Sequence, residues 1–88
     1  MTITQIRYAI AVAETGSMTK AAQRFGVKQP SVSAAIAELE REMDVQLFER
    51  AATGVKVTKP GREFLSELAV LCQSIQRMEK RYQPVVFR

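Results

Sequence analysis

The side chains of this sequence best suited to binding a ligand are basic, and many of them lie in stretches of the sequence that contain no acidic residue. Two intervals, 15–37 and 50–62, contain no acidic residue. The basic residues within them are Lys20, Arg24, Lys28, Arg50, Lys56, Lys59 and Arg62. In a chain of net charge +4, two such patches would suit a phosphate backbone. On charge alone, an ordinary solvated surface with chance clustering explains the pattern equally well.

Catalysis and metal binding find little support in the composition. Histidine is absent and Cys72 is the single cysteine, which excludes the ordinary zinc sites and an internal disulfide framework. The commonest general base is therefore missing as well. We expect no enzymatic activity, no cofactor and no metal. Cys72 is expected to pack as an apolar residue, because neither a basic neighbour nor a second cysteine is apparent that would activate it for redox chemistry.

The stretch from Met18 to Met43 predicts how the polar groups are positioned. Ala22 is small enough to let a neighbouring helix approach closely, and Gly26 supplies the left-handed residue that ends a helix. Pro30 suits the first turn of the next helix, and Val32 returns to the core. This spacing is that of a helix-turn-helix, with a small residue, a glycine in the turn and an aliphatic residue in the second helix.

The remaining patterns predict a mainly α, winged helix-turn-helix fold with a three-helix core, a short two-stranded wing and a long linker and dimerisation helix. The expected helices are 2–14, 18–25, 29–43 and 59–83, and the expected strands are 45–50 and 55–58. Thr2 with Gln5, Ser17 and Thr58 are expected to cap helices, and Asp44 to end the third one. The residues expected in the core are Ile6, Ile10, Ala13, Met18, Ala21, Ala22, Phe25, Val32, Ile36, Leu39 and Met43.

The outward face of the third predicted helix is small and nearly uncharged over its first two turns. Its members are Pro30, Ala34, Ala37 and Arg41, flanked by Ser31 and Ser33. A solvated helix usually carries Lys and Glu on such a face. Small side chains let a helix enter the major groove of DNA, and amides at its N-terminus can meet phosphate. The alternative is a packing surface for another protein.

The last predicted helix carries a heptad seam, which indicates dimerisation. Its apolar residues recur at spacings of four and three and are Phe64, Leu68, Leu71, Ile75, Met78 and Tyr82. At 1.5 Å per residue the helix reaches roughly 37 Å, far beyond a three-helix core. Burying each large apolar side chain is worth roughly 1.5–3 kcal/mol, so we expect the seam to pair with a second copy of the chain.

Length and hydropathy limit the class of protein. Eighty-eight residues suffice for one small domain, with a winged helix-turn-helix over 1–58, the dimerisation helix over 59–83 and a tail or truncation point over 84–88. The sequence contains neither an apolar run of about 20 residues nor a signal peptide. We therefore expect no membrane partner and a cytoplasmic location.

Taken as a set, these residues resemble the N-terminal DNA-binding domain of LysR-type transcriptional regulators, and the likeness covers nearly the whole chain. The matching stretches are Ile6-Arg7-Tyr8, 12–22 (VAETGSMTKAA), 27–33 (VKQPSVS), Ile36 with Leu39-Glu40, 45–50 (VQLFER), and Val57-Thr58 followed by Gly61. The resemblance implies a linker helix that pairs antiparallel with its partner. It also implies an effector domain of roughly 200 residues after the linker. These 88 residues do not contain that domain, and any small-molecule effector site would lie in it.

Residue by residue, the resemblance implies a set of DNA contacts. The residues of the recognition helix near bases and phosphates would be Gln29, Pro30, Ser31 and Ser33. Arg50 with the wing would reach phosphate or the minor groove, and Thr58 lies where the linker helix begins. Many family members carry arginine where this chain has Ala34 and a basic residue where it has Thr53, and an aromatic residue often replaces Ala9. The first two departures lead us to expect specificity through methyl contacts and DNA shape.

The resulting hypothesis is a homodimer that places two recognition helices in major grooves about one helical turn, or a multiple of it, apart. The residues expected to attract the DNA electrostatically are Lys20, Arg24, Lys28, Arg50 and Lys56. Those expected to fix the position of the protein along the duplex are Gln29, Ser31 and Ser33. Alternatively, Arg24 and Arg50 form structural ion pairs, for which the nearby acids are Glu14, Glu38 and Glu49. The rival functions are a stand-alone winged-helix repressor without an effector domain and a module that docks another protein. A full-length protein could pair such dimers into tetramers.

Overall fold

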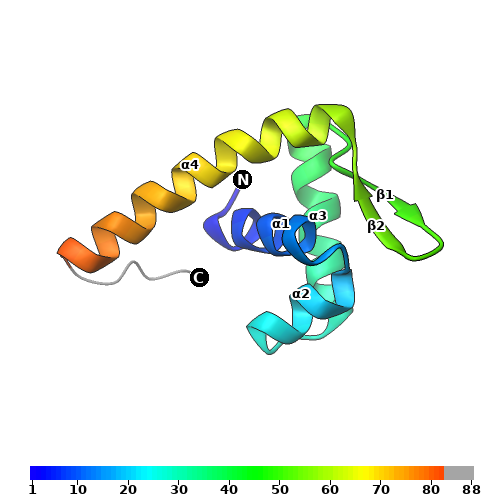
Figure 1. Ribbon diagram of the computed structural model, residues 1–88, viewed down its shortest axis with the longest axis horizontal. Helices are drawn as coiled ribbons and strands as arrows, with labels where there is room; N and C mark the ends of the chain where they lie inside the picture. Colours follow the sequence, from blue (N-terminus) through cyan, green and yellow to red (C-terminus); the bar gives the residue numbers. More distant parts are fainter. Residues whose placement is uncertain (83–88) are drawn as a thin grey trace.

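The computed structural model describes residues 1–82, which form four helices and one two-stranded antiparallel sheet (Figure 1). The elements are α1 (Ile3–Thr15), α2 (Met18–Phe25), α3 (Gln29–Met43), β1 (Phe48–Ala51), β2 (Gly54–Val57) and α4 (Lys59–Arg81). This order confirms the predicted winged helix-turn-helix followed by a long helix. Residue 83 of the expected last helix and the expected tail over 84–88 lie outside the described residues. Within 1–82, no helix combines the length and the apolarity that crossing a membrane requires.

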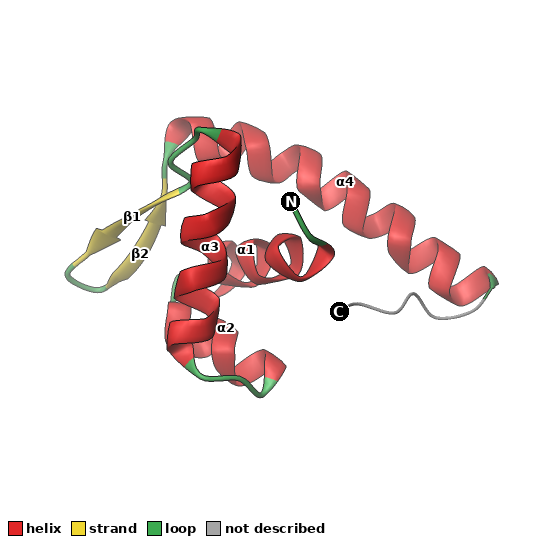
Figure 2. Cartoon of the chain, turned by 180° about the vertical axis from the view of Figure 1, so that it is seen from behind, coloured by secondary structure: helices red, strands yellow, loops and turns green. Residues whose placement is uncertain are grey.

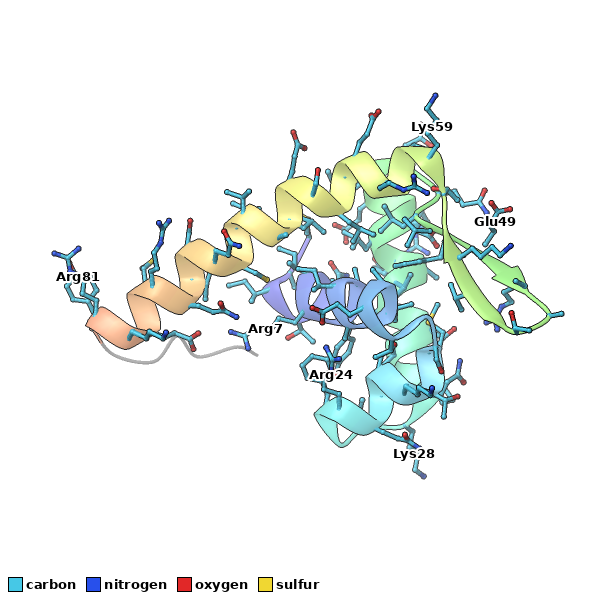
Figure 3. The ribbon with its side chains drawn as sticks, viewed as in Figure 1. Arg7, Arg24, Lys28, Glu49, Lys59 and Arg81 are labelled. Atoms are coloured by element: carbon cyan, nitrogen blue, oxygen red, sulfur yellow. The ribbon has the colours of Figure 1, made fainter. Side chains whose placement is uncertain are left out.

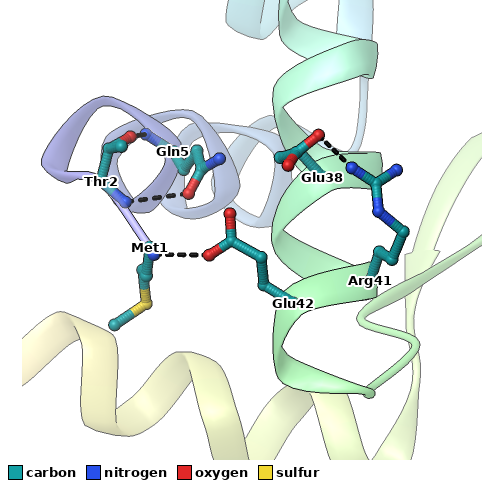
Figure 4. Close-up of polar contacts among 6 residues, drawn as sticks. All are labelled: Met1, Thr2, Gln5, Glu38, Arg41 and Glu42. Carbon is teal, nitrogen blue, oxygen red and sulfur yellow. Dashed lines mark hydrogen bonds and ion pairs between the residues drawn. The ribbon is translucent and has the colours of Figure 1, made fainter.

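Local sequence signals set the helix boundaries, as predicted. The Thr2 hydroxyl accepts a hydrogen bond from the Gln5 amide at 3.1 Å, and the Gln5 side chain accepts one from the Thr2 amide at 2.9 Å (Figure 4). Ser17 caps α2 by accepting from the amide three residues on, at 3.1 Å. Gly26 and Asp44 end α2 and α3 in the left-handed conformation, with φ of 65° and 51°. Among residues with a side chain, aspartate tolerates this conformation better than most.

The core lies where α1, α2 and α3 pack together, and the first half of α4 adds to it (Figure 2). The largest fully buried side chains are Val12, Val32, Ile36, Leu39 and Leu47. Two residues expected in the core, Phe25 and Met43, are exposed instead. Each lies in the last turn of its helix, where part of the side chain reaches solvent. The Phe25 ring packs on Tyr8 at the rim of the core, with 5.0 Å between the ring centroids.

The wing is the hairpin over residues 48–57. β1 is shorter than the predicted strand 45–50, and β2 begins and ends one residue before the predicted strand 55–58. β1 and β2 pair in register from Phe48 with Val57 to Ala51 with Gly54. This register leaves a two-residue turn at the tip. Residues 45–47 were expected in the first strand, but they lie outside the sheet.

Leu47 joins α3, the wing and α4 at one point, which explains the late start of the first strand. Its side chain is 0% exposed, and its amide donates to Glu40 Oε2 at 2.6 Å. Its carbonyl accepts from the Thr58 amide at 2.9 Å. The Thr58 hydroxyl caps α4 by accepting from the Gly61 amide at 2.9 Å, and it donates to the Gln46 carbonyl. Leu47 would pair with Thr58 if the register continued, but the Leu47 amide is taken by Glu40 and the Thr58 carbonyl accepts from the Arg62 amide, so the ladder ends at Phe48.

Helix α4 is buried along its first half and projects along its second. Gly61, Leu65 and Leu68 pack into the core, and the rest of the helix extends away from the body on the side opposite the wing (Figures 1 and 2). Arg7 of α1 donates to Glu79 Oε1 at 3.2 Å and ties the projecting half to α1. Leu68, predicted to belong to the dimerisation seam, is 2% exposed within its own chain and is part of the core. A heptad pattern cannot distinguish the side of α4 that meets α1 from the side open to a partner.

The substitution Gly61→Ala tests the junction around Leu47. A Cβ at this position would lie 2.8 Å from the Cα of Leu47 and closer still to its carbonyl oxygen, so the backbone would have to move. We expect a loss of about 1–3 kcal/mol in the free energy of unfolding, even though alanine favours a helix by up to about 1 kcal/mol. Urea unfolding followed by circular dichroism measures the change. The exposed control Ser66→Ala on the same helix should stay within about 0.5 kcal/mol, and an equally small effect of Gly61→Ala would contradict the close packing.

Candidate nucleic-acid interface

The N-terminal half of α3 presents a small, uncharged surface to solvent, as the sequence predicts. Its exposed residues are Pro30, Ser31, Ala34 and Ala37, with Gln29 and Ser33 half-buried beside them. Lys28 is the N-cap residue of α3, and its side chain makes no capping hydrogen bond. Pro30 has no amide hydrogen and the Ser31 amide donates to the Lys28 carbonyl at 3.0 Å, so few amides at this end of the helix remain for an external anion.

A groove separates α3 from the wing. It is lined on the α3 side by Ser33 and Glu40, among others, and on the wing side by Arg50 and Val55. A second groove shares Arg50 and Val55 with the first and reaches Gln29 and the N-terminus of α2. Arg50 is therefore the cation that borders both grooves beside the exposed face of α3.

The register of the hairpin places its two central basic residues on opposite sides. Arg50 faces Val55 across the ladder, and Glu49 faces Lys56. Directly opposed residues share one side of an antiparallel pair, and the side alternates along each strand. Arg50 thus lies on the same side as the buried Phe48, toward α3, whereas Lys56 lies with Glu49 on the outer side. Figure 3 shows Glu49 directed away from the helices.

Arg24 is placed differently from the other basic residues expected to contact DNA. Its Nη1 lies 2.5 Å from Glu14 Oε1, and Figure 3 shows it between α1 and α2, on the side away from the wing. Lys20 and Lys28 are exposed near the N-termini of α2 and α3. The structural ion pair considered for Arg24 is therefore what the fold contains, and this residue leaves the set of candidate contacts.

Polar contacts in the fold bear on two further expectations, the ion pairs considered for Arg50 and the DNA contact expected of Thr58. Within residues 1–82, Arg50 forms no ion pair with Glu38, because Glu38 pairs with Arg41 (Figure 4), and none with Glu49, which lies on the other side of the wing. Arg50 therefore keeps its charge for an external ligand. Thr58 was expected at the interface, but its hydroxyl caps α4 and bonds to the backbone before the wing. Its role in the fold is structural.

An apolar strip runs along α4 beside the face that packs on α1, and all of it except Phe64 lies on the projecting half. With Leu68 assigned to the core, the strip consists of Phe64, Leu71, Ile75, Met78 and Tyr82. These residues share one side of the helix at about 100° per residue. Leu71, Met78 and Tyr82 are 47%, 52% and 71% exposed. Val70 is exposed too, but it lies about 100° around the helix from Leu71 and stands outside the strip.

In the sequence, Glu40 and Arg7 stand out only as parts of the family resemblance, and neither is predicted to have a role of its own. Glu40 borders the groove beside Arg50 and accepts the backbone amide of Leu47 seven positions away. No local pattern predicts that bond. Arg7 binds Glu79 from the far end of the chain. An isolated arginine in the largely apolar first helix is the signal that could have singled it out.

Cys72 lies in a cleft between α1, α2 and α4 that is also lined by Arg7, Glu14 and Arg24. The sequence suggested no basic neighbour for this thiol, and the fold supplies Arg7. Burial raises the pKa of the Cys72 thiol, Arg7 lowers it and Glu14 raises it, with a net increase above the ordinary value. The thiol is therefore protonated at neutral pH and poorly nucleophilic. Within residues 1–82, no three carboxylate or thiol groups gather in a way that could hold a metal ion.

Comparison with known sequences agrees with this arrangement. The profile of bacterial regulatory helix-turn-helix proteins of the lysR family matches residues 3–62. The HTH-type transcriptional regulator TfdT of Cupriavidus pinatubonensis is 42% identical over 83 residues, which are 94% of this chain and 36% of TfdT. The uncharacterized HTH-type transcriptional regulator YvbU of Bacillus subtilis is 40% identical over 81 residues, 91% of this chain and 28% of YvbU. The chain thus spans about a third of the length of these relatives.

Solved structures resemble the chain through α4 as well as through the helix-turn-helix. The DNA-binding domain of CbnR in complex with DNA matches with a TM-score of 0.85 at 36% identity, covering 92% of this chain and 93% of that chain. The DNA-binding domain of BenM in complex with catB site 1 DNA matches with a TM-score of 0.87 at 36% identity, covering 92% and 91%. Full-length CbnR complexed with its target DNA matches with a TM-score of 0.85 at 36% identity, and the match covers 92% of this chain but only 28% of that chain.

The raised pKa of Cys72 predicts slow alkylation. At pH 7.5 iodoacetamide should modify the folded chain more slowly than the same chain in urea, because burial holds the thiol protonated. The rate should continue to rise with pH beyond the pKa of an ordinary thiol. Mass spectrometry of quenched samples measures the modified fraction. A folded chain that reacts faster than the unfolded one would indicate an activated thiolate and would contradict this assignment.

Proposed function

Because the chain belongs to the LysR family of bacterial regulatory helix-turn-helix proteins, we propose that it binds double-stranded DNA sequence-specifically as the N-terminal domain of a transcriptional regulator. The observation that carries the proposal is the small, uncharged face of α3 bordered by Arg50 of the wing. The similarity to the DNA-bound domains of CbnR and BenM supports it.

Helix α3 is the element that enters the major groove. An α-helix with its side chains is about 10–12 Å across, and the major groove is about 12 Å wide. The short side chains of Pro30, Ala34 and Ala37 narrow the exposed side of α3, so its backbone can approach the base edges closely. Gln29 and Ser33 supply hydrogen-bonding groups near the tip. A helix with long charged side chains on this face would be held further out.

Phosphate contacts come from basic groups around α3. Lys20 and Lys28 flank the N-termini of the two helices of the motif, and Arg50 reaches across the groove from the wing. Lys56 approaches from the outer side of the wing. Such contacts fix the register of the protein on the duplex without reading its sequence. Arg24, held by Glu14 on the opposite side of α2, makes no contribution.

Specificity then depends on few direct contacts. The arginine that many family members carry on α3 is replaced by Ala34, and the basic residue of the wing tip by Thr53. Alanine can contact a thymine methyl group, and the serines accept or donate to several bases. The bend and groove width of the flanking DNA would supply the remaining discrimination.

The apolar strip of α4 is the proposed dimer interface. Burying each of its large side chains is worth roughly 1.5–3 kcal/mol, and its exposure on the projecting half leaves it open to a second copy. An antiparallel pair of α4 helices would form a two-fold interface in which the same strip is used twice. The two α3 helices would then face successive major grooves about one helical turn, or a multiple of it, apart.

The relatives extend well beyond the length of this chain. Since the relatives are about three times as long as this chain, we propose that a C-terminal effector domain follows α4 in the complete protein and that it senses a small molecule. Dimers of such a protein could assemble into tetramers. The proposed site of action is the bacterial chromosome in the cytoplasm, and the proposed role involves no catalysis.

Binding to a pool of random duplex DNA, followed by fluorescence anisotropy at several salt concentrations, tests the function. We expect binding that weakens steeply with salt, with a slope of log K against log salt of about −0.9 for each phosphate engaged. Ser33→Glu should abolish binding, because it introduces a negative charge on the α3 side of the groove that Arg50 borders. The result measures whether this face meets DNA.

The matched control is Ser66→Glu, which makes the same change at an exposed position of α4 outside the strip. It should bind like the wild type. Absence of binding by a folded wild-type dimer at low salt, or equal losses in both variants, would overturn the proposal. Salt-insensitive association with a protein would then favour the protein-docking alternative.

Placing glutamates within the strip tests the dimer. The double variant Leu71→Glu/Met78→Glu should be monomeric at concentrations where the wild type is dimeric, because two charges would have to be buried in each half of the interface. Sedimentation velocity measures the change. Val70→Glu, on the same exposed half but outside the strip, should remain dimeric. If Val70→Glu dissociated the dimer as well, or if the double variant stayed dimeric, the interface would lie elsewhere.

A further inference from the structure

We propose that Glu40 is a positioning residue for DNA binding, which holds the wing beside α3 so that Arg50 reaches the phosphate backbone. The inference rests on the proposed DNA binding and adds a residue that does not itself touch DNA. Its basis is a pair of hydrogen bonds from α3 to the start of β1. Glu40 Oε2 accepts the amide of Leu47 at 2.6 Å and that of Phe48 at 3.3 Å.

The two amides need this acceptor because their residues are buried. The Leu47 and Phe48 side chains both lie in the core, and a buried amide without a partner strongly disfavours the folded arrangement. A carboxylate is a stronger acceptor than a neutral group, because the hydrogen bond is charge-assisted. The Phe48 bond joins the first residue of β1 to α3, and the Leu47 bond joins the residue just before the strand to the same carboxylate. The carboxylate therefore ties the wing directly to the helix that enters the groove.

The neighbouring acids of α3 are used differently. Glu38 pairs with Arg41, and Glu42 accepts from the N-terminal amine at 2.6 Å (Figure 4). Both are partners of a cation near the surface. Glu40 forms no ion pair within the described part of the chain and bonds to backbone amides instead. The Glu40 carboxylate therefore fixes the course of the backbone at the start of the wing and does not neutralise a surface cation.

The place of Glu40 is otherwise unfavourable for DNA binding. Glu40 lines the same groove as Arg50 and Ser33, where a negative charge would repel phosphate. Arg50 lies two residues beyond Phe48 on the short strand β1. A shift of the strand at Phe48 therefore moves Arg50 with it. The position of the arginine relative to α3 depends on the carboxylate that anchors the strand.

On the other strand, a second anchor holds the wing to the body. The Val55 amide donates to the Gly16 carbonyl at 3.0 Å, and a Cβ at Gly54 would lie 2.5 Å from the same oxygen. This contact joins β2 to the turn between α1 and α2, whereas the Glu40 carboxylate holds the start of the wing to α3. Loss of the Glu40 bonds should therefore displace Arg50 without detaching the whole wing.

Glu40→Ala tests the proposal because its two explanations predict opposite signs. If Glu40 were merely a surface charge, its removal would strengthen binding to duplex DNA. If Glu40 positions the wing, its removal should weaken binding by about tenfold at ~0.1 M salt. This is the loss expected when one charged hydrogen bond, here from Arg50 to a phosphate, no longer forms. Fluorescence anisotropy with the 88-residue chain measures the affinity. Glu49→Ala is the matched control, because it removes the same charge one residue before Arg50 and should bind as tightly as the wild type or more tightly.

An Arg50→Ala background separates positioning of the wing from a general loss of stability. In that background Glu40→Ala should change the affinity by less than about twofold, since the contact that Glu40 positions is already missing. Glu40→Gln keeps an acceptor oxygen, so its affinity for DNA should lie between those of the wild type and Glu40→Ala. If Glu40→Ala fails to fold, Glu40→Gln is tested in its place. Unchanged or tighter binding by folded Glu40→Ala, or the same loss with and without Arg50, would overturn the proposal.

Amide exchange makes the inference testable apart from DNA binding. In the free protein, exchange at Leu47 and Phe48, measured by NMR, should accelerate in the glutamine or alanine variant and stay unchanged in Glu49→Ala. If the wild type bound no DNA, the proposed function would fail at that point. Unaltered exchange in the Glu40 variants would instead refute the anchoring itself.

Discussion

The backbone at Leu47 is the constraint on which the arrangement of the domain depends. Its side chain fills the core, so its amide and carbonyl must find partners away from water. Glu40 of α3 supplies one partner and Thr58 at the start of α4 supplies the other. Gly61 lets α4 pass directly against this residue. Where the wing begins and the direction in which α4 leaves the body both follow from these few contacts.

The charges of the molecule divide into those that complete the fold and those that remain available. Arg24 and Arg7 are held by Glu14 and Glu79, on the side of the body that faces α4 and away from the wing. Arg50, by contrast, borders the uncharged face of α3. Lys20 and Lys28 are exposed near the same face, so these three basic residues stay available at the surface proposed to meet DNA.

Helix α4 serves two neighbours with adjacent sides of one amphipathic surface. Leu65 and Leu68 complete the core of the domain, and Leu71 and Met78 stay exposed next to them. The bond from Arg7 to Glu79 holds the projecting half against α1. The orientation of the proposed dimer interface relative to α3 is therefore set by packing within one chain, before a second copy is engaged.

The local parts of this structure were determined by the sequence, because they depend on residues within about four positions of one another. The caps at Thr2 and Ser17, the left-handed ends at Gly26 and Asp44 and the bounds of α2 and α3 are of this kind, and so is the uncharged face of α3. The tertiary structure alone decided which groups meet across the chain: the pairing of Arg24 with Glu14, the burial of Leu68, the internal use of Thr58, and the bonds of Glu40 that delay the first strand. The physical reason is that these contacts form between segments that only the folded core brings together, and no local spacing records them.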